Sequence, residues 1–416
     1  MWASGPHLTI SNSMSIKQPL VCQLGMAGVN FKHNRVDLCY RSIKGTSKKY
    51  NTISEAVNDE ELCKQRLQLL NGEWPAGCYD CQYMEQHGSK SYRQRVKLLD
   101  IDTPDQYFLD NVDPVTGKVK TLRRIEFRFD NTCNFACRHC SAEYSSSWEK
   151  IVRNNPQVSK FEGTDLKRFE PTSYATGLEN LNEIEKFLDD EGLEIEITGG
   201  EPFFQHRFYE CLEQLQPFAK RINLIVTTNG SIAGKFKKYD IKSLLAPFRE
   251  VYLKVSMDGS KSFFNYFRQG GDWDTTVSNV KSFASLPNIR ISPIVTISIF
   301  QAARMPEIYT DFHEINKNTN SFSAGEVLHP PMLNPIHLPK PLKQKYLKEW
   351  EEFSNGLSRS KPAKRLAEFS LKMLQSEVED SKWIEFCQYT DQLDKIHNKN
   401  VFDYFPEWQE FWHKTT

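Results

Sequence analysis

The sequence carries no net charge and no long apolar run, and each absence excludes a class of protein. Its 53 Lys and Arg residues balance 53 Asp and Glu residues, so charge gives no argument for nucleic acid or an anionic membrane surface as a partner. There is no stretch of ~18 or more apolar residues, which excludes a transmembrane helix. The N-terminus lacks the basic segment and apolar core of a signal peptide.

Cysteine, by contrast, is well represented. The 416-residue chain contains ten cysteines, and without a secretion signal this number indicates metal ligation in a reducing compartment rather than disulfides. Hydrophobic residues make up 39% and charged residues 25%, as in an ordinary soluble globular protein. The length allows two domains, or one large domain with an appendage. We therefore expect a cytoplasmic protein.

Three of the cysteines directly follow a predicted strand. Apolar residues alternate at Ile125, Phe127 and Phe129, which predicts a strand over Arg123–Phe129. The loop after it carries the pattern CxxxCxxC, formed by Cys133, Cys137 and Cys140. An iron–sulfur cube normally takes four cysteines, so three would leave one iron open, much as a catalytic zinc site keeps an open position. A structural zinc site or buried free thiols are the alternatives.

This motif after a first strand resembles the signature of the radical S-adenosylmethionine (SAM) enzymes. The resemblance implies that Cys133, Cys137 and Cys140 hold a [4Fe–4S] cluster whose open iron is chelated by SAM. It also implies that an electron from the cluster splits SAM, giving a 5′-deoxyadenosyl radical that abstracts hydrogen from a substrate. A low-potential donor such as flavodoxin or ferredoxin would supply the electron. His139 takes the place of the aromatic residue that often stands beside the adenine in this family.

From residue 121 onward, predicted strands and helices alternate, which indicates an α/β fold with a parallel sheet and right-handed crossovers. The six strands are expected at Arg123–Phe129, Leu193–Thr198, Ile222–Thr228, Val251–Met257, Ile289–Ser298 and Phe322–Leu328. Helices are expected between them, for example at Leu178–Leu188 and Phe208–Phe218. Six such units resemble the partial (β/α)6 TIM-type barrel of radical SAM enzymes. In barrels of this type the functional residues gather at the carboxyl ends of the strands.

Two strand ends carry residues that match family motifs. Gly199, Gly200, Glu201 and Pro202 follow the second strand and match the family's GGEP motif, which implies contacts to the amino group of SAM. Two glycines let a backbone approach a ligand closely, although a plain strand-to-helix turn would also use them. Asn229 follows the third strand and resembles the family's TN turn at the edge of the SAM pocket. Turns of that composition are common.

Later strands supply four more candidates for SAM binding. Ser256 and Asp258 lie on the same side of the fourth strand, and the resemblance gives this position the ribose hydroxyls. Alternatively, Asp258 caps a helix. Arg268 corresponds to the arginine that pairs with the SAM carboxylate, a role that suits its planar fork, unless it is a solvated surface residue. Val295 on the fifth strand would contact adenine, although core packing explains it equally well.

The first hundred residues offer a second set of cysteines. Cys22 and Cys39 flank a predicted hairpin with its turn near His33-Asn34, and a hairpin brings its ends together. Cys78 and Cys81 form a CxxC pattern, so the four thiols predict a metal site that zinc or an iron–sulfur cluster would satisfy. A single helix is expected before them, with Ser54 or Asn58 as N-cap and Gly72 just past its end. Cys63 within it is expected to be an apolar filler.

The segment Leu69–Arg93 resembles the twitch domain, a shortened SPASM domain that holds one auxiliary cluster beside a radical SAM core. The resemblance implies that Cys22, Cys39, Cys78 and Cys81 bind a second cluster, expected to be [4Fe–4S]. The twitch domain more often follows the barrel, so its N-terminal position is a departure. We expect a twitch/SPASM-like domain over 1–115, a radical SAM core over 116–330 and a helical C-terminal extension over 331–416.

Outside these motifs, the sequence suggests local roles. Ser145–Trp148 and the tail Tyr389–Trp412 match radical SAM proteins that contain a twitch domain, and the serines could also cap a helix. Helices are expected near Lys343–Leu357 and Lys364–Glu379. Cys211 is expected in the core, and Cys387 has no partner pattern.

The motifs leave the substrate open, and three hypotheses remain. The first is a radical SAM enzyme acting on a small molecule such as a sugar or nucleotide, which the lack of a peptide-recognition module favours. The second is a peptide- or protein-modifying radical enzyme, whose auxiliary cluster would take an electron from the product radical. The third is a zinc-binding protein without catalysis.

Overall fold

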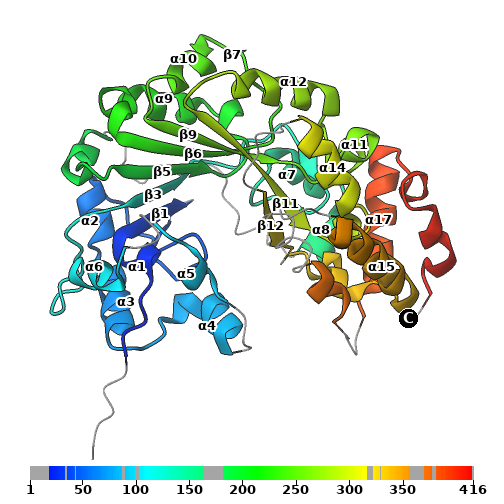
Figure 1. The fold of residues 1–416 in the computed structure, drawn as a ribbon, viewed down its shortest axis with the longest axis horizontal. Coiled ribbons are helices and arrows are strands. Elements are labelled where there is room, and N and C mark those ends of the chain that lie inside the picture. The colour runs from blue at the N-terminus through cyan, green and yellow to red at the C-terminus, as the bar shows by residue number, and fades with distance from the viewer. Residues whose placement is uncertain are drawn as a thin grey trace, which may run out of the picture.

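The computed structural model describes residues 18–32, 35–42, 44–86, 90–98, 103–162, 181–315, 322–327, 329–356, 370–376 and 381–414. It is a mixed α/β structure built on one eight-stranded sheet, which curves through the molecule as an arc with helices along its outer side (Figure 1). In that view the N-terminal segment lies below one end of the arc and the C-terminal segment below the other.

The sheet runs in the order β12-β11-β9-β6-β5-β3-β1-β2. Its strands are β1 (Gly28–Lys32), β2 (Arg35–Asp37), β3 (Arg124–Arg128), β5 (Leu193–Thr198), β6 (Ile222–Thr228), β9 (Glu250–Ser256), β11 (Ile289–Ile297) and β12 (Ser323–Glu326). All neighbours pair in parallel except β1 and β2, which form an antiparallel hairpin. Two short pairs lie outside it: β4 (Ala136–Cys137) with β10 (Arg268–Gln269), and β7 (Lys235–Phe236) with β8 (Tyr239–Asp240).

The six strands predicted after residue 120 are therefore all present, close to their expected ends, although Leu328 lies outside the described residues. They are adjacent in sequence order, without the reversal of a doubly wound sheet. The N-terminal hairpin is also confirmed, with its turn at His33-Asn34 outside the described part of the chain. What was not predicted is that β1 pairs in parallel with β3 and so extends the same sheet.

The helices are α1 (Gln23–Ala27), α2 (Ile53–Val57), α3 (Glu60–Leu70), α4 (Tyr79–Gln86), α5 (Tyr92–Arg95), α6 (Asp105–Asp110), α7 (Ser146–Asn154), α8 (Pro156–Glu162), α9 (His206–Leu215), α10 (Ile241–Leu245), α11 (Lys261–Phe267), α12 (Trp273–Ala284), α13 (Ile299–Ala302), α14 (Met305–Ile315), α15 (Lys340–Gly356) and α17 (Trp383–His397). Among them, α9, α10 and α12 lie along the outer side of the arc (Figure 1). The helix predicted at Leu178–Leu188 is a 3₁₀ helix over Leu181–Phe187, and its first residues fall outside the described part.

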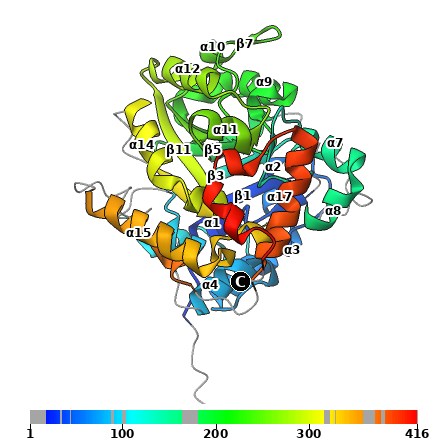
Figure 2. The ribbon, with the colours of Figure 1, turned by 90° about the vertical axis from the view of Figure 1, so that its right-hand side faces the viewer.

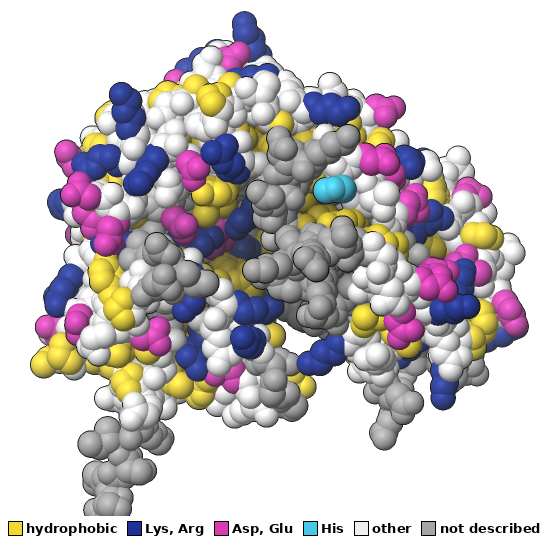
Figure 3. All heavy atoms as spheres, in the orientation of Figure 1, with side chains coloured by type: hydrophobic (Ala, Val, Ile, Leu, Met, Phe, Trp, Pro, Cys, Tyr) yellow, Lys and Arg dark blue, Asp and Glu magenta, His cyan; other side chains and the backbone are white. Residues whose placement is uncertain are grey.

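The two faces of the sheet differ in polarity because side chains alternate along each strand. Ile125 and Phe127 on β3 are fully buried, and the Phe127 ring stacks on Phe31 of β1 with centroids 5.4 Å apart. Glu126 between them is charged and belongs to the other face, where Glu196 of β5 pairs with Lys254 of β9 at 2.6 Å. In Figure 3 the molecule is hollowed between its N-terminal and C-terminal segments.

One prediction in the N-terminal segment is wrong. The single helix expected there is two helices, α2 and α3, because two residues cap separately: Thr52 accepts from the N–H of Glu55, and Asp59 accepts from that of Glu61. Asn58 is the C-cap of α2 rather than an N-cap. The hydroxyl of Ser54, the other predicted N-cap, instead donates to Glu183 at 2.8 Å.

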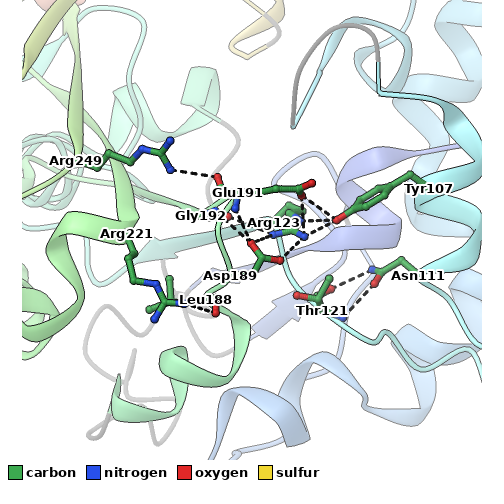
Figure 4. A network of polar contacts seen from close by, with 10 residues as sticks. All are labelled: Tyr107, Asn111, Thr121, Arg123, Leu188, Asp189, Glu191, Gly192, Arg221 and Arg249. Atoms are coloured by element: carbon green, nitrogen blue, oxygen red, sulfur yellow. Dashed lines mark hydrogen bonds and ion pairs between the residues drawn. The ribbon is translucent and has the colours of Figure 1, made fainter.

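A polar network joins the N-terminal segment to the main sheet (Figure 4). The guanidinium of Arg123, just before β3, donates to the hydroxyl of Tyr107 on α6 at 2.8 Å and to Asp189 at 2.6 Å. Asn111 at the end of α6 donates to the carbonyl of Met26 at 2.7 Å. One apolar core also runs from the hairpin through β3 to β11, so the two segments are packed together.

The C-terminal helices pack over the end of the sheet that carries β11 and β12 (Figures 1 and 2). The predicted helix Lys343–Leu357 is α15, and Leu357 lies outside the described residues. The prediction at Lys364–Glu379 falls largely outside them as well. The tail packs by aromatic contacts, such as Trp383 of α17 against Trp408. In the part of the chain that the structure describes, no helix is long and apolar enough to cross a bilayer.

Candidate functional site

The cysteines of the CxxxCxxC motif lie in the loop that leaves the carboxyl end of β3. Cys137 is on the short strand β4, where it pairs directly with Arg268 of β10. Burial, together with the nearby Cys137, raises the pKa of Cys133 to about 12. The pKa of Cys140 is also far above its usual value, because the thiol is buried and both other cysteines are close. The three thiols therefore lie near one another and stay protonated at neutral pH unless a metal cation stabilises the thiolates.

The start of helix α7 holds this loop in place. Ser145 is the N-cap of α7 and accepts from the N–H of Trp148 at 3.1 Å. The hydroxyl of Ser146 accepts from the N–H of Cys133 at 3.1 Å, and the indole of Trp148 donates to the carbonyl of Cys137 at 2.5 Å. The serine tract thus caps a helix, as the sequence suggested, and also binds the cysteine loop, which was not predicted.

Gly199 and Gly200 bring the loop after β5 against the cysteine loop. Both have positive φ, +84° and +48°, which side chains disfavour. A Cβ on Gly200 would lie 2.4 Å from the carbonyl oxygen of Thr132, so close packing of two protein loops already requires this glycine. Gln205 joins the same loops by donating to the carbonyls of Thr132 and Gly199 at 3.2 and 3.0 Å. Sequence reasoning missed Gln205, and its place shortly after GGEP was its only signal.

Glu201 is fully buried and turned toward the next strand. Its carboxylate accepts from the hydroxyl of Thr228 at 2.7 Å and from the N–H of Asn229 at 2.5 Å. Burial raises its pKa to about 7. Asn229 in turn donates to the side chain of Asn134, inside the cysteine loop, at 2.9 Å. Pro202 is buried at the first position of a short 3₁₀ helix. These residues hold the strand ends together around the cysteine loop.

Asp258, Arg268 and His139 form a second buried group beside the cysteines. Asp258 accepts from the N–H of Thr296 at 2.7 Å and forms an ion pair with Arg268. The Nε2 of His139 lies 3.8 Å from Asp258, and the ring stacks on Phe267 with centroids 5.1 Å apart. Within the described residues, Nε of Arg268 and Nδ1 of His139 are buried without a hydrogen-bond partner. Buried polar atoms of this kind are rare unless a ligand or water pairs with them.

The remaining candidates lie next to this group. Ser256 is half-buried at the end of β9. It pairs with Ile294 of β11, the residue that precedes Val295. Val295 is 2% exposed and belongs to the apolar core under the C-terminal helices, so core packing accounts for it. Asp258 is not a helix cap, because α11 begins after Ser260.

The second set of cysteines also comes together. Cys22 caps α1, Cys39 follows β2, Cys78 ends a 3₁₀ helix and Cys81 lies in α4. Burial raises the pKa of Cys39, and the other three cysteines raise it further. Burial also raises the pKa of Cys22 to about 11 and that of Cys78 to about 12, with Cys81 adding to both. Four thiols from three chain segments thus lie near one another.

Cys63 lies apart from this group. Its thiol donates to the carbonyl of Asn58 at 3.4 Å. The charges that act on it are those of Arg66, Lys118 and Asp59, and none of the other cysteines is among them. Its position in α3 therefore agrees with the expected role as a filler.

The two sets of cysteines could in principle hold either a single metal ion or an iron–sulfur cluster. Among the residues that the structure describes, no three His, Cys, Asp or Glu side chains converge as the ligands of one metal ion do. A structural zinc ion needs four ligands around a single atom. An iron–sulfur cube normally takes four cysteines, and a set of three leaves one iron open.

Comparison with known proteins gives partial matches. No protein-family model matches the chain. Over 131 residues it is 30% identical to the GTP 3′,8-cyclases of two Helicobacter pylori strains, a match that covers 31% of this chain. It covers 33% of each cyclase, so the chain spans about a third of the length of the curated relatives it matches. The matched relatives are enzymes.

Solved structures give weaker similarities. Streptococcus suis SuiB bound to S-adenosylmethionine is 15% identical with a TM-score of 0.34, over 71% of this chain and 63% of that one. The protein anSMEcpe with bound AdoMet is 18% identical with a TM-score of 0.34, over 56% and 59% of the two chains. Similarity at this level does not establish a shared fold.

Proposed function

We propose that this protein is a radical SAM enzyme with two iron–sulfur clusters. The observation that carries the proposal is the meeting of Cys133, Cys137 and Cys140 with Arg268 and His139 at the carboxyl ends of parallel strands. With SAM and a [4Fe–4S] cluster bound, such a site supplies a 5′-deoxyadenosyl radical by reductive cleavage, and the radical abstracts hydrogen from a substrate.

The roles of the chain's own residues follow from their contacts. The three thiolates bind the cluster, and α7 together with Gln205 holds their loop. Arg268 binds the carboxylate of SAM through the donor that has no protein partner, while Asp258 orients its guanidinium. His139 stays beside the adenine because Phe267 stacks on its ring. Gly199 to Pro202, Asn229, Ser256 and Val295 complete the pocket wall.

The proposed architecture is a partial (β/α)6 barrel with a twitch-like segment before it. The sequential order of the six parallel strands supports the barrel. The gathering of Cys22, Cys39, Cys78 and Cys81 supports a second cluster, of the [4Fe–4S] type. The proposed domains are residues 1–115, 116–330 and 331–416. Strand β1 of the first domain pairs with β3 and so extends the sheet of the second domain.

The substrate is proposed to be a small molecule, and a peptide or protein remains the second candidate. The name of the cyclase relatives includes a nucleotide, which agrees with a small molecule, but the match covers a third of their length. Anaerobic incubation with fractions of cell extract separates the candidates by asking whether small-molecule or peptide fractions raise the yield of 5′-deoxyadenosine. A low-potential electron donor and a cytoplasmic location complete the proposal.

Iron content tests the two-cluster proposal against a zinc protein. Anaerobically reconstituted protein is brown and contains about eight irons if both clusters are cubes. Replacing Cys133, Cys137 and Cys140 together by alanine removes about half of the iron. A colourless protein with bound zinc, or loss of all iron in the triple variant, would contradict the proposal.

A further inference from the structure

Arg93 contacts two of the three chain segments that carry the second set of cysteines, the one with Cys22 and the one with Cys78 and Cys81. Its Nη1 donates to the carbonyl of Val21, the residue before Cys22, at 2.9 Å. Its Nη2 pairs with Glu85 of α4, the helix that contains Cys81, at 2.6 Å. Its guanidinium also lies over the ring of Trp74, 5.2 Å from the centroid, just before the turn that ends at Cys78. These contacts join segments that are far apart in the sequence.

The arginine is itself held in place. Arg93 lies on α5, whose N-terminus has a capping box between Ser91 and Gln94. The hydroxyl of Ser91 also donates to Glu85, so the acid that pairs with Arg93 is anchored to the same helix. The side chain of Arg93 is 15% exposed, and the orientation of its guanidinium is therefore fixed by packing as well as by charge.

The guanidinium of Arg93 lies beside the segment of Cys22, because it donates to the carbonyl of the preceding residue, and beside α4, because it pairs with Glu85 there. In addition, Nε of Arg93 is buried without a partner in the described structure. An unpaired N–H beside a set of thiolates can donate a hydrogen bond to sulfur.

We propose that Arg93 positions the second cluster and raises its reduction potential. This inference rests on the proposed function, because it assumes a cluster bound by these cysteines. Reduction adds one electron to a cluster and makes it more negative, so a nearby cation stabilises the reduced form. Charge and hydrogen bonds to sulfur are the known means by which a protein sets the potential of such clusters. Arg93 thereby makes the second cluster a better electron acceptor.

The test uses full-length protein in which Cys133, Cys137 and Cys140 are alanine, so that only the second cluster remains. Iron content measures positioning, and a redox titration with dithionite, followed by electron paramagnetic resonance, measures the midpoint potential. For Arg93→Met we expect lower iron content and a potential shifted negative by about 59 mV, a tenfold change in the one-electron equilibrium constant. Glu85→Gln should shift the potential in the positive direction, because it removes the charge that partly neutralises Arg93.

Two controls separate this inference from general damage. Arg95→Met changes an exposed arginine on the same helix and should leave both iron content and potential unchanged. Arg93→Lys keeps the charge but loses the planar fork, so it should keep the potential better than Arg93→Met does. If Arg93→Met binds no iron, the positioning role is supported and Glu85→Gln alone decides the effect of charge.

The inference is overturned if Arg93→Met retains full iron at the parent potential, or if Glu85→Gln leaves the potential unshifted or moves it negative. If the triple-alanine protein with Arg93 and Glu85 intact binds no iron, the proposal of a second cluster is itself contradicted. The two failures are therefore distinguishable.

Discussion

Asp394, in the C-terminal helix α17, forms an ion pair with Arg138, which lies inside the CxxxCxxC motif next to Cys137. Arg138 is 1% exposed, and its guanidinium lies 3.8 Å from the ring centroid of Tyr266. The hydroxyl of Tyr389, also on α17, donates to the carbonyl of Arg138 at 2.6 Å. The C-terminal extension is therefore part of the structure that holds the cysteine loop.

Replacing Asp394 by asparagine should destabilise the protein strongly. The change leaves Arg138 as a buried charge without its partner, which costs about 3–5 kcal/mol in comparable cases. Denaturant unfolding measures the loss, and iron content of the anaerobically reconstituted protein should fall with it. Asp391→Asn is the matched control, because Asp391 is on the same helix but 45% exposed and pairs with His413. It should change stability by less than about 1 kcal/mol, and equal effects of the two changes would contradict the proposed role of Asp394.

Gly200→Ala should destabilise the protein even when no SAM is present. The added Cβ would lie 2.4 Å from the carbonyl oxygen of Thr132, at a backbone with φ of +48°. The left-handed conformation alone costs about 1–2 kcal/mol, and the steric clash adds to it. Gly234→Ala, at an exposed position where a Cβ meets no atom within 4 Å, should stay within about 0.5 kcal/mol. Unfolding curves that show no difference between the two variants would mean that the loops are not packed as described.

The ligand set proposed for the second cluster predicts the effects of single cysteine changes. In the background that lacks Cys133, Cys137 and Cys140, Cys22→Ser and Cys78→Ser should each lose or alter the remaining visible absorption. Cys63→Ser should leave it unchanged, because the thiol of Cys63 binds the carbonyl of Asn58 instead. Bleaching by Cys63→Ser but not by Cys22→Ser would show that the wrong four cysteines have been assigned.

Glu201 should make stability depend on pH in the direction opposite to an ordinary surface carboxylate. Burial raises its pKa from 4.5 to about 7 in the folded protein, so between these values the folded state holds a proton that the unfolded state has lost. Its contribution to stability is therefore present below about pH 4.5 and decreases as the pH rises to about 7. Glu201→Gln, which imitates the protonated acid, should lack this decrease. Parallel stability curves for the two proteins across that range would refute the assignment.

The strands could be predicted because their signal is local. Ile125 and Phe127 alternate with charged residues, and the pattern alone defines β3 and its two faces. The pairing of β1 with β3 could not be predicted, since nothing in Val29 or Phe31 indicates which strand lies beside them. The division of α2 from α3 was missed because Thr52, Ser54, Asn58 and Asp59 are all good caps, and tertiary contacts decide which of them acts.

The candidate site shows the same division between local and distant signals. The cysteine spacing and the GGEP motif locate the site, because the ligands and the backbone turns are close in sequence. Arg138 and Asp394 are separated by most of the chain, and no pattern links them before folding. The inward turn of Glu201 toward Thr228 likewise depends on how two neighbouring strands end.

The most direct test of radical SAM chemistry is the fate of SAM on the protein itself. We predict that anaerobically reconstituted, reduced protein slowly converts SAM into equal amounts of methionine and 5′-deoxyadenosine without substrate. Chromatography of the products after hours of incubation measures both. The Cys137→Ala variant should form neither, since it lacks one ligand of the cluster that binds SAM. No cleavage by the iron-loaded protein, or robust cleavage by Cys137→Ala, would contradict the account.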